Sequence, residues 1–310
     1  MNLIPASREE NSPYYQLLII AGYALLGLFT GTLLSIAVLI GLYGTGVLSN
    51  AAALSGGDPA FATGLQIAQL LTTVFTFIVP SILFAATEKT KVSRFYNFRK
   101  PTAALFLIVF IFMICTIPLM EWIALINQKM TLPGFLKPVE AWMREKEDAA
   151  MKMTYLLLRI RNAGDFLVDL GLIALLPGVA EELLFRGALQ RSFYRMYKNP
   201  HVAIWISAFI FSAIHVQFFG FFPRMILGAA FGYIYFWTGS LWYTMFAHFL
   251  NNAFSVCQAW YLQAHHIPLE QSDNSSNFPW YGYVISLILS IFLLKYIKDK
   301  TTQHNGEQLD

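Results

Sequence analysis

Three ionisable side chains lie close together in an apolar stretch, VAEELLFRGALQ at residues 179–190: Glu181, Glu182 and Arg186. On an α-helix Glu182 and Arg186 are four residues apart with the acid nearer the N-terminus, which is the favourable order for an ion pair. Glu181 lies about 100° around the helix from Glu182 and cannot share the arginine equally well. The spacing therefore predicts a Glu182–Arg186 pair and leaves Glu181 available for another role. The alternative is one buried network of all three that holds helices together.

Two histidines on later apolar segments are candidates to work with Glu181. His215 ends the motif FSAIH, and a turn at residues 199–200 would make its segment antiparallel to the one that carries Glu181. At 1.5 Å per residue Glu181 and His215 lie about 27 and 24 Å from this turn, so the two are predicted to be level. His248 and Asn252, in AHFLNN, are spaced i, i+4 and project from one helix face.

These side chains have the chemistry to hydrolyse a peptide bond. A carboxylate in an apolar site can take a proton from water, and an imidazole can share that work. His248 and Asn252 could donate hydrogen bonds to the developing oxyanion. Alternatively, Glu181, His215 and His248 could ligate Zn²⁺ with water in the open position. The residues leave both mechanisms open, but the sequence has no HEXXH motif, which excludes a zincin of that kind.

The composition indicates what must position these residues. Of the 310 residues 56% are hydrophobic and only 13% are charged, as in a polytopic membrane protein. Eight apolar segments are candidates to cross the membrane as helices, at about 16–44, 64–87, 103–126, 166–185, 201–217, 222–237, 241–262 and 279–295. An ionisable side chain at membrane depth costs on the order of 3 kcal/mol, so each needs a partner or a function. The segments also contain Glu121, Asp169 and Arg224.

We therefore expect an all-α membrane protein of about eight transmembrane helices with a catalytic cavity among helices 4, 5 and 7. Four regions divide it: N-terminal transmembrane helices 1–3 at 1–126, an amphipathic interfacial loop or helix at 127–164, a catalytic core at 165–262, and the last transmembrane helix with a cytoplasmic tail at 263–310. The second region is read as a connector, or alternatively as a lid that guides substrate.

The basic residues predict how the chain is oriented. Lysines and arginines concentrate at the segment ends that face residues 88–101, 186–200 and the C-terminal tail, which lie on one side if eight helices alternate. By the positive-inside rule both termini are expected in the cytoplasm. No basic cluster with interleaved aromatic residues indicates nucleic acid as a partner.

Three motifs occur in order on apolar segments, EELLFR, FSAIH and HFLNN, and together they resemble the EExxxR, FxxxH and HxxxN signatures of the CPBP family. This family comprises CAAX proteases and bacteriocin-processing proteins and is also called Abi. The resemblance covers roughly residues 165–255, and the short chain looks like the bacterial branch, which implies a location in the bacterial inner (cytoplasmic) membrane.

The resemblance implies an eight-helix intramembrane endopeptidase with its site in a conical cavity. Glu181 and His215 would activate water, and His248 and Asn252 would stabilise the oxyanion. The supporting residues would be Glu182, Arg186 and Phe211. Family members have been described both as metalloproteases and as metal-independent glutamate proteases, so the resemblance leaves zinc open.

Two other functions compete with a protease that cleaves membrane proteins or peptides, lipidated or not. The first is a non-proteolytic membrane scaffold or regulator of the same family, which would have the same fold but no peptidase activity. A transporter with a proton relay ranks last, because it predicts inverted repeats or paired broken helices, whereas a single Gly/Pro break, at Pro177 and Gly178, lies near the charges. Membrane lipid is expected as a partner in each case, and the sequence leaves the oligomeric state open.

Overall fold

The computed structural model describes residues 10–49, 58–269 and 278–306, and these residues contain helices and no strand. The long helices are α1 (Pro13–Tyr43), α4 (Ala62–Thr73), α5 (Val79–Thr87), α7 (Ala103–Gln128), α8 (Lys137–Leu157), α9 (Ala163–Asp169), α10 (Leu176–Glu182), α11 (Arg191–Tyr197), α12 (Pro200–Ala213), α13 (Phe221–Thr238), α14 (Leu241–Ala264) and α15 (Trp280–Gly306). Short helical pieces are α2 (Gly46–Ser49), α6 (Val92–Phe95), η1 (Pro59–Phe61), η3 (Gly134–Leu136) and η6 (Phe218–Gly220). The predicted all-α fold is confirmed.

Six helices of the described residues are long and apolar enough to cross a membrane, judged by length and composition. The chain is thus a polytopic integral membrane protein. The other two predicted segments are helices as well, but α12 has only 14 residues. Helix α14 has 24 residues, and polar side chains such as His248, Asn251 and Asn252 lower its hydropathy.

Two of the membrane helices widen into π turns just before a proline. Stretch η2 (Val74–Ile78) joins α4 to α5, and η4 (Leu170–Leu175) joins α9 to α10. Pro80 and Pro177 are each the second residue after the end of the π stretch. A proline ring clashes with the carbonyl four residues before it, and a π turn relieves this clash without ending the helix. The predicted break at Pro177 is therefore a local widening of one continuous helix.

Pro118 lies inside α7, and a serine of a neighbouring helix forms hydrogen bonds with the backbone groups near it. Ser286 on α15 accepts a hydrogen bond from the Leu119 N–H at 3.0 Å and donates one to the Cys115 carbonyl. These are the two backbone groups that the helix would otherwise join to each other. Such repair by a serine is what allows proline inside a membrane helix.

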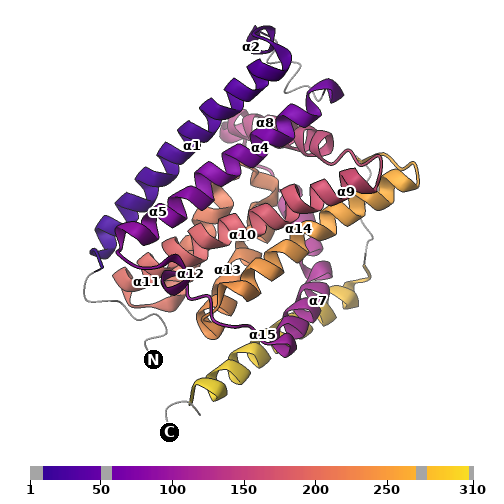
Figure 1. The fold of residues 1–310 in the computed structure, drawn as a ribbon. Coiled ribbons are helices and arrows are strands. Elements are labelled where there is room, and N and C mark those ends of the chain that lie inside the picture. Colours follow the sequence, from indigo (N-terminus) through magenta and orange to yellow (C-terminus); the bar gives the residue numbers. More distant parts are fainter. Residues whose placement is uncertain (1–9, 50–57, 270–277, 307–310) are drawn as a thin grey trace.

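Helices α10 and α14 run side by side through the centre of the molecule (Figure 1). Gly178 makes their close approach possible, because a Cβ atom there would come within 3.0 Å of the Phe249 backbone nitrogen. Helices α1, α4 and α5 lie on one side of this pair, and α7 packs with α15 on the other. The close α10–α14 contact sets the distance between the acidic motif and HFLNN.

The turns that carry most basic residues meet at one end of the bundle. Arg191 forms an ion pair of 2.7 Å with Glu10, just before α1. Glu88, just after α5, accepts a hydrogen bond from the Asn11 backbone, and Ser240, at the start of α14, donates to the Arg99 carbonyl. The predicted alternation of helices is therefore present.

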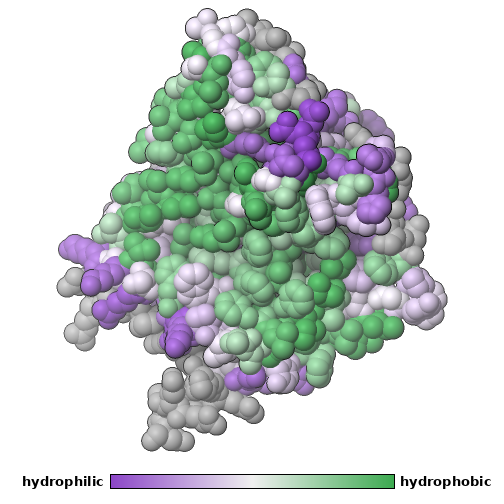
Figure 2. Space-filling model, turned by 45° about the vertical axis from the view of Figure 1, so that its right-hand side comes forward, coloured by the Kyte–Doolittle hydropathy of each residue, from purple (hydrophilic) through white to green (hydrophobic). Residues whose placement is uncertain are grey.

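Helix α8 spans the predicted amphipathic region at the opposite end (Figure 1). Its first turn is held by Glu140, whose pKa is lowered to about 2 by a hydrogen bond from Lys137, by the Leu132 backbone N–H and by Arg144. Figure 2 shows a broad apolar band on the molecular surface, with hydrophilic side chains gathered beyond its edges. A surface of this kind suits a protein embedded in lipid.

Candidate functional site

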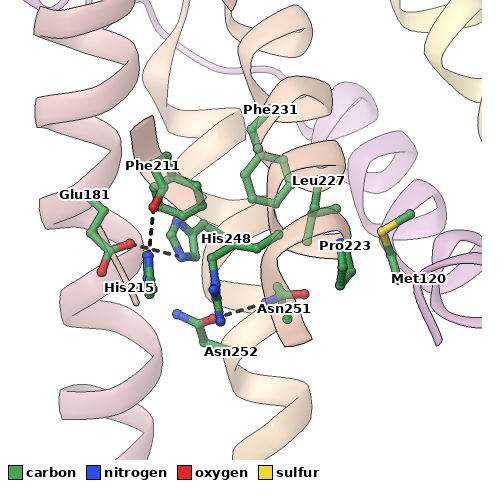
Figure 3. Close-up of a pocket in the computed structure, with 13 residues that line it drawn as sticks. Met120, Glu181, Phe211, His215, Pro223, Leu227, Phe231, His248, Asn251 and Asn252 are labelled. Carbon is green, nitrogen blue, oxygen red and sulfur yellow. Dashed lines mark hydrogen bonds and ion pairs between the residues drawn. The ribbon is translucent and has the colours of Figure 1, made fainter. Parts of the chain in front are cut away.

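A cavity of about 300 Å³ lies between α7, α10, α13 and α14 (Figure 3). All four predicted catalytic residues line it: Glu181, His215, His248 and Asn252. Phe211, Leu227, Phe231 and Met120 supply much of its apolar wall. The structure thus brings together residues that are up to 71 positions apart in the sequence, counting from Glu181 to Asn252.

The predicted ion pair between Glu182 and Arg186 is present and buried. Arg186 Nη1 lies 2.7 Å from Glu182 Oε1, and both side chains are at most 1% exposed. Arg186 Nη2 donates to the Gly228 carbonyl at 2.9 Å, so the arginine also ties this helix to α13. The pair stands at the start of η5 (Leu183–Gln190), the π stretch that leads into α11.

Glu182 has a second partner that the sequence did not indicate. Its Oε1 lies 3.0 Å from His248 Nδ1, across the α10–α14 contact. The Glu182 carboxylate therefore orients the histidine in addition to forming the predicted pair with Arg186. Helical spacing could not reveal a contact between residues 66 positions apart. With Nδ1 held in this way, His248 presents Nε2 to the cavity, 3.8 Å from Glu181 Oε2.

His215 lies beyond the end of α12 and not within a helix that extends to 217. The helix ends at Ala213, and the turn that follows contains Val216 with a φ of +54°, a left-handed conformation that a β-branched residue rarely adopts. His215 Nδ1 is 2.7 Å from the Phe211 carbonyl oxygen. Glu181 and His215 face each other in Figure 3. The turn therefore places this imidazole at the cavity.

Phe211 contacts three of the site residues, which gives its predicted supporting role a physical basis. Its ring centroid lies 5.1 Å from that of His215 and 5.8 Å from that of His248. The Arg186 guanidinium lies over the same ring, 4.7 Å from the centroid. The phenylalanine thus spaces the two histidines and covers the buried cation.

Two further polar residues line the cavity but were not among the predicted site residues. Asn251 Nδ2 donates to Asn252 Oδ1 at 3.1 Å, which leaves the NH₂ group of Asn252 free to donate. Arg224 also lines the cavity and was recognised only as one charge among several at membrane depth. Neither residue stands at a motif position, so only their places in the fold identify them.

The side chains do not form a ligand set for a metal ion. Among the residues that the structure describes, no group of three His, Cys, Asp or Glu side chains is arranged to hold a metal. Glu181, His215 and His248 share the cavity, and each histidine has its Nδ1 held by another protein group, as metal-ligating histidines also do. The use of Zn²⁺ stays a prediction, which metal analysis of an active preparation tests.

Fold and cavity together define the class: an integral membrane protein with a polar cavity inside a helical bundle. Residues 163–254 match the Rce1-like family model, described as Type II CAAX prenyl endopeptidase Rce1-like. Over 105 residues the chain is 32% identical to the Bacillus subtilis (strain 168) protein named "Uncharacterized protein YpbD", an alignment that covers 33% of this chain and 49% of that protein. The chain thus spans about half the length of this curated relative. No solved structure matches the chain.

The matched segment runs from α9 into α14 and contains every predicted site residue. Both matches agree with the three motifs. Over this segment the chain is similar to a family of CAAX-type proteases, in agreement with its resemblance to the CPBP family.

Proposed function

We propose that the protein is an intramembrane endopeptidase that hydrolyses peptide bonds of membrane-associated proteins or peptides. The observation that carries this proposal is the meeting of Glu181, His215, His248 and Asn252 around one cavity inside the bundle. An acid that can accept a proton, two imidazoles and a free amide are the groups that water-driven peptide hydrolysis needs.

In the proposed mechanism, Glu181 takes a proton from water as the water oxygen attacks the substrate's carbonyl carbon. His215 helps to activate the same water through its Nε2, because its Nδ1 is held at the Phe211 carbonyl. The carbonyl oxygen becomes negative and accepts hydrogen bonds from Asn252 Nδ2 and from His248 Nε2. When the carbon–nitrogen bond breaks, the proton moves to the leaving nitrogen.

Glu182 and Arg186 support this chemistry and do not take part in it. The Glu182 carboxylate lies 3.0 Å from His248 Nδ1 and so orients the ring with its Nε2 toward the cavity. Arg186 balances the charge of Glu182 in a site closed to water. Hydrogen-bond donors to the oxyanion, the role proposed for His248 and Asn252, contribute about 10²–10³-fold each to the rate of acyl transfer.

Substitution of the proposed base tests the function directly. Glu181→Gln keeps the shape of the side chain but cannot accept the proton, so cleavage of a membrane peptide by the purified, folded protein should fall at least about 10²-fold. Glu145→Gln, on the exposed face of α8, is the matched control and should cleave as the wild type does. Undiminished cleavage by Glu181→Gln would refute the proposal. Rescue of a deletion phenotype by a Glu181→Gln, His215→Ala variant would instead favour the scaffold role.

A further inference from the structure

Arg224 lines the cavity, and the proposed mechanism does not use it. It lies in the first turn of α13, and its Nη2 donates to Gln217 Oε1 at 2.6 Å. Its Nη1 is buried and has no hydrogen-bond partner among the described residues. Glu147 and Glu181 attract it electrostatically. The cavity therefore contains a cation with an unused donor.

Arg186, which also lies at the site, differs from Arg224 in that both of its terminal nitrogens have partners. Arg186 gives one terminal nitrogen to Glu182 and the other to the Gly228 carbonyl. An unpaired charged donor away from water is costly, and buried donors are almost always paired. Arg224 is thus arranged to receive a partner that enters the cavity.

The shape of the guanidinium and the charge of the cavity indicate what that partner is. Guanidinium nitrogens bind a carboxylate better than a neutral group, through short charge-assisted hydrogen bonds. Glu181 alone would repel a negative substrate group, and Arg224 offsets that repulsion within the same cavity. One guanidinium balances a single negative charge, which is the charge of one carboxylate.

An apolar route leads to Arg224 from the side of the bundle. A second cavity, of about 1020 Å³, lies between α7 and α14 and shares Met120, Pro223, Leu227 and Asn251 with the first. Pro223 precedes Arg224 directly and lines both cavities. An apolar peptide segment in the larger cavity would thus reach the guanidinium with a polar end.

We propose that Arg224 binds a carboxylate of the substrate beside the cleaved bond, so that the protein selects acidic over neutral peptide ends. The proposal rests on the proposed function and names the substrate chemistry of the same site. The carboxylate has two possible sources, the free C-terminus of the peptide or an Asp or Glu side chain close to the cleaved bond.

The test uses two pairs of quenched-fluorescent apolar peptides. The first pair has the same sequence and ends either in a free carboxylate or in an amide. The second pair has an amidated end and carries either Asp or Asn beside the cleaved bond. The wild type should cleave one acidic form about tenfold to hundredfold more efficiently in kcat/KM than its neutral counterpart, through a lower KM. The pair that shows the difference identifies the source of the carboxylate. Arg224→Gln should reduce the ratio to near one while cleavage of the neutral form persists.

Gln217→Glu is the second variant and leaves Arg224 in place. It puts a carboxylate 2.6 Å from the guanidinium and should also abolish the preference, because Arg224 is then neutralised from within. Arg161→Gln, an exposed arginine paired with Asp165 far from the cavity, is the control for net charge and should keep the preference. Equal cleavage of both pairs by the wild type, or a preference that survives in both cavity variants, would overturn the proposal.

A binding measurement separates this inference from the proposed function. If the wild type cleaves none of the peptides, fluorescence anisotropy compares binding of the same four peptides to Glu181→Gln and to Glu181→Gln, Arg224→Gln. Tighter binding of an acidic form that the second substitution abolishes supports the carboxylate site without proteolysis. Equal binding of acidic and neutral forms to Glu181→Gln refutes it.

Discussion

At the scale of single residues, Glu182 has two roles: it neutralises the buried charge of Arg186 and it orients the proposed catalytic residue His248. Its Oε1 contacts both Arg186 and His248, at 2.7 and 3.0 Å. Glu182→Ala should lower the free energy of unfolding by about 3–5 kcal/mol, because it leaves Arg186 charged and buried without its partner. Glu182→Gln, Arg186→Met removes both charges and should recover most of that stability. Thermal unfolding in detergent measures these differences.

Activity should not recover with stability in the double variant, because His248 has lost the carboxylate that holds its Nδ1. We expect kcat to stay at least about tenfold low with KM little changed, as for a group that acts in the transition state. Wild-type kcat in the stable double variant would mean that Glu182 is only a structural counterion. The Glu182–Arg186 contact was predictable from one helix turn, whereas the contact to His248 depends on how α10 meets α14.

At the scale of elements, the turn after α12 decides where His215 lies. Val216 holds a φ of +54° there, which costs a β-branched residue on the order of 1–3 kcal/mol. Val216→Gly should keep activity and raise stability by up to about 1 kcal/mol, because glycine adopts this conformation freely. Val216→Pro should lose most activity, because proline fixes φ near −65° and removes the N–H that bonds to the Ala213 carbonyl. Both variants lack the valine side chain, so a difference in activity between them reports the backbone conformation at residue 216. Equal activities of the two variants would contradict the proposed role of this turn in placing His215.

The sequence predicted where most helices lie but not where this one ends. The apolar run continues past Ala213 through Ile214 and Val216, so hydropathy alone extends the helix to 217. The chain leaves the helix through the left-handed residue and is held by Ser212 Oγ, which donates to the Phe221 carbonyl at 2.7 Å. The π turns before Pro80 and Pro177 likewise could not be predicted from the sequence, because a proline predicts a break in a helix but not the geometry of that break.

At the scale of the whole molecule, the alternation of the helices between two ends of the bundle was predictable from the basic residues. The charged turns near Glu10, Glu88, Arg99 and Arg191 meet at one end. His215 and Arg224 flank the α12–α13 turn, which lies at the end where Asn127, the next to last residue of α7, donates to the Phe218 carbonyl. If the basic end faces the cytoplasm, the turn that carries these two residues faces the opposite side.

Cysteine labelling in intact cells tests this orientation. Cys115 and Cys257 would first be replaced by serine, and single cysteines placed at the exposed positions Ser93, in the basic loop, and Glu145, on α8. The positive-inside rule predicts that a membrane-impermeant maleimide labels the cysteine at 145 in intact cells and the one at 93 only after permeabilisation. The reverse pattern would place the basic end outside and turn the α12–α13 end toward the cytoplasm. The result decides which compartment supplies the carboxylate that Arg224 is proposed to bind, because a polar peptide end does not cross the bilayer unaided.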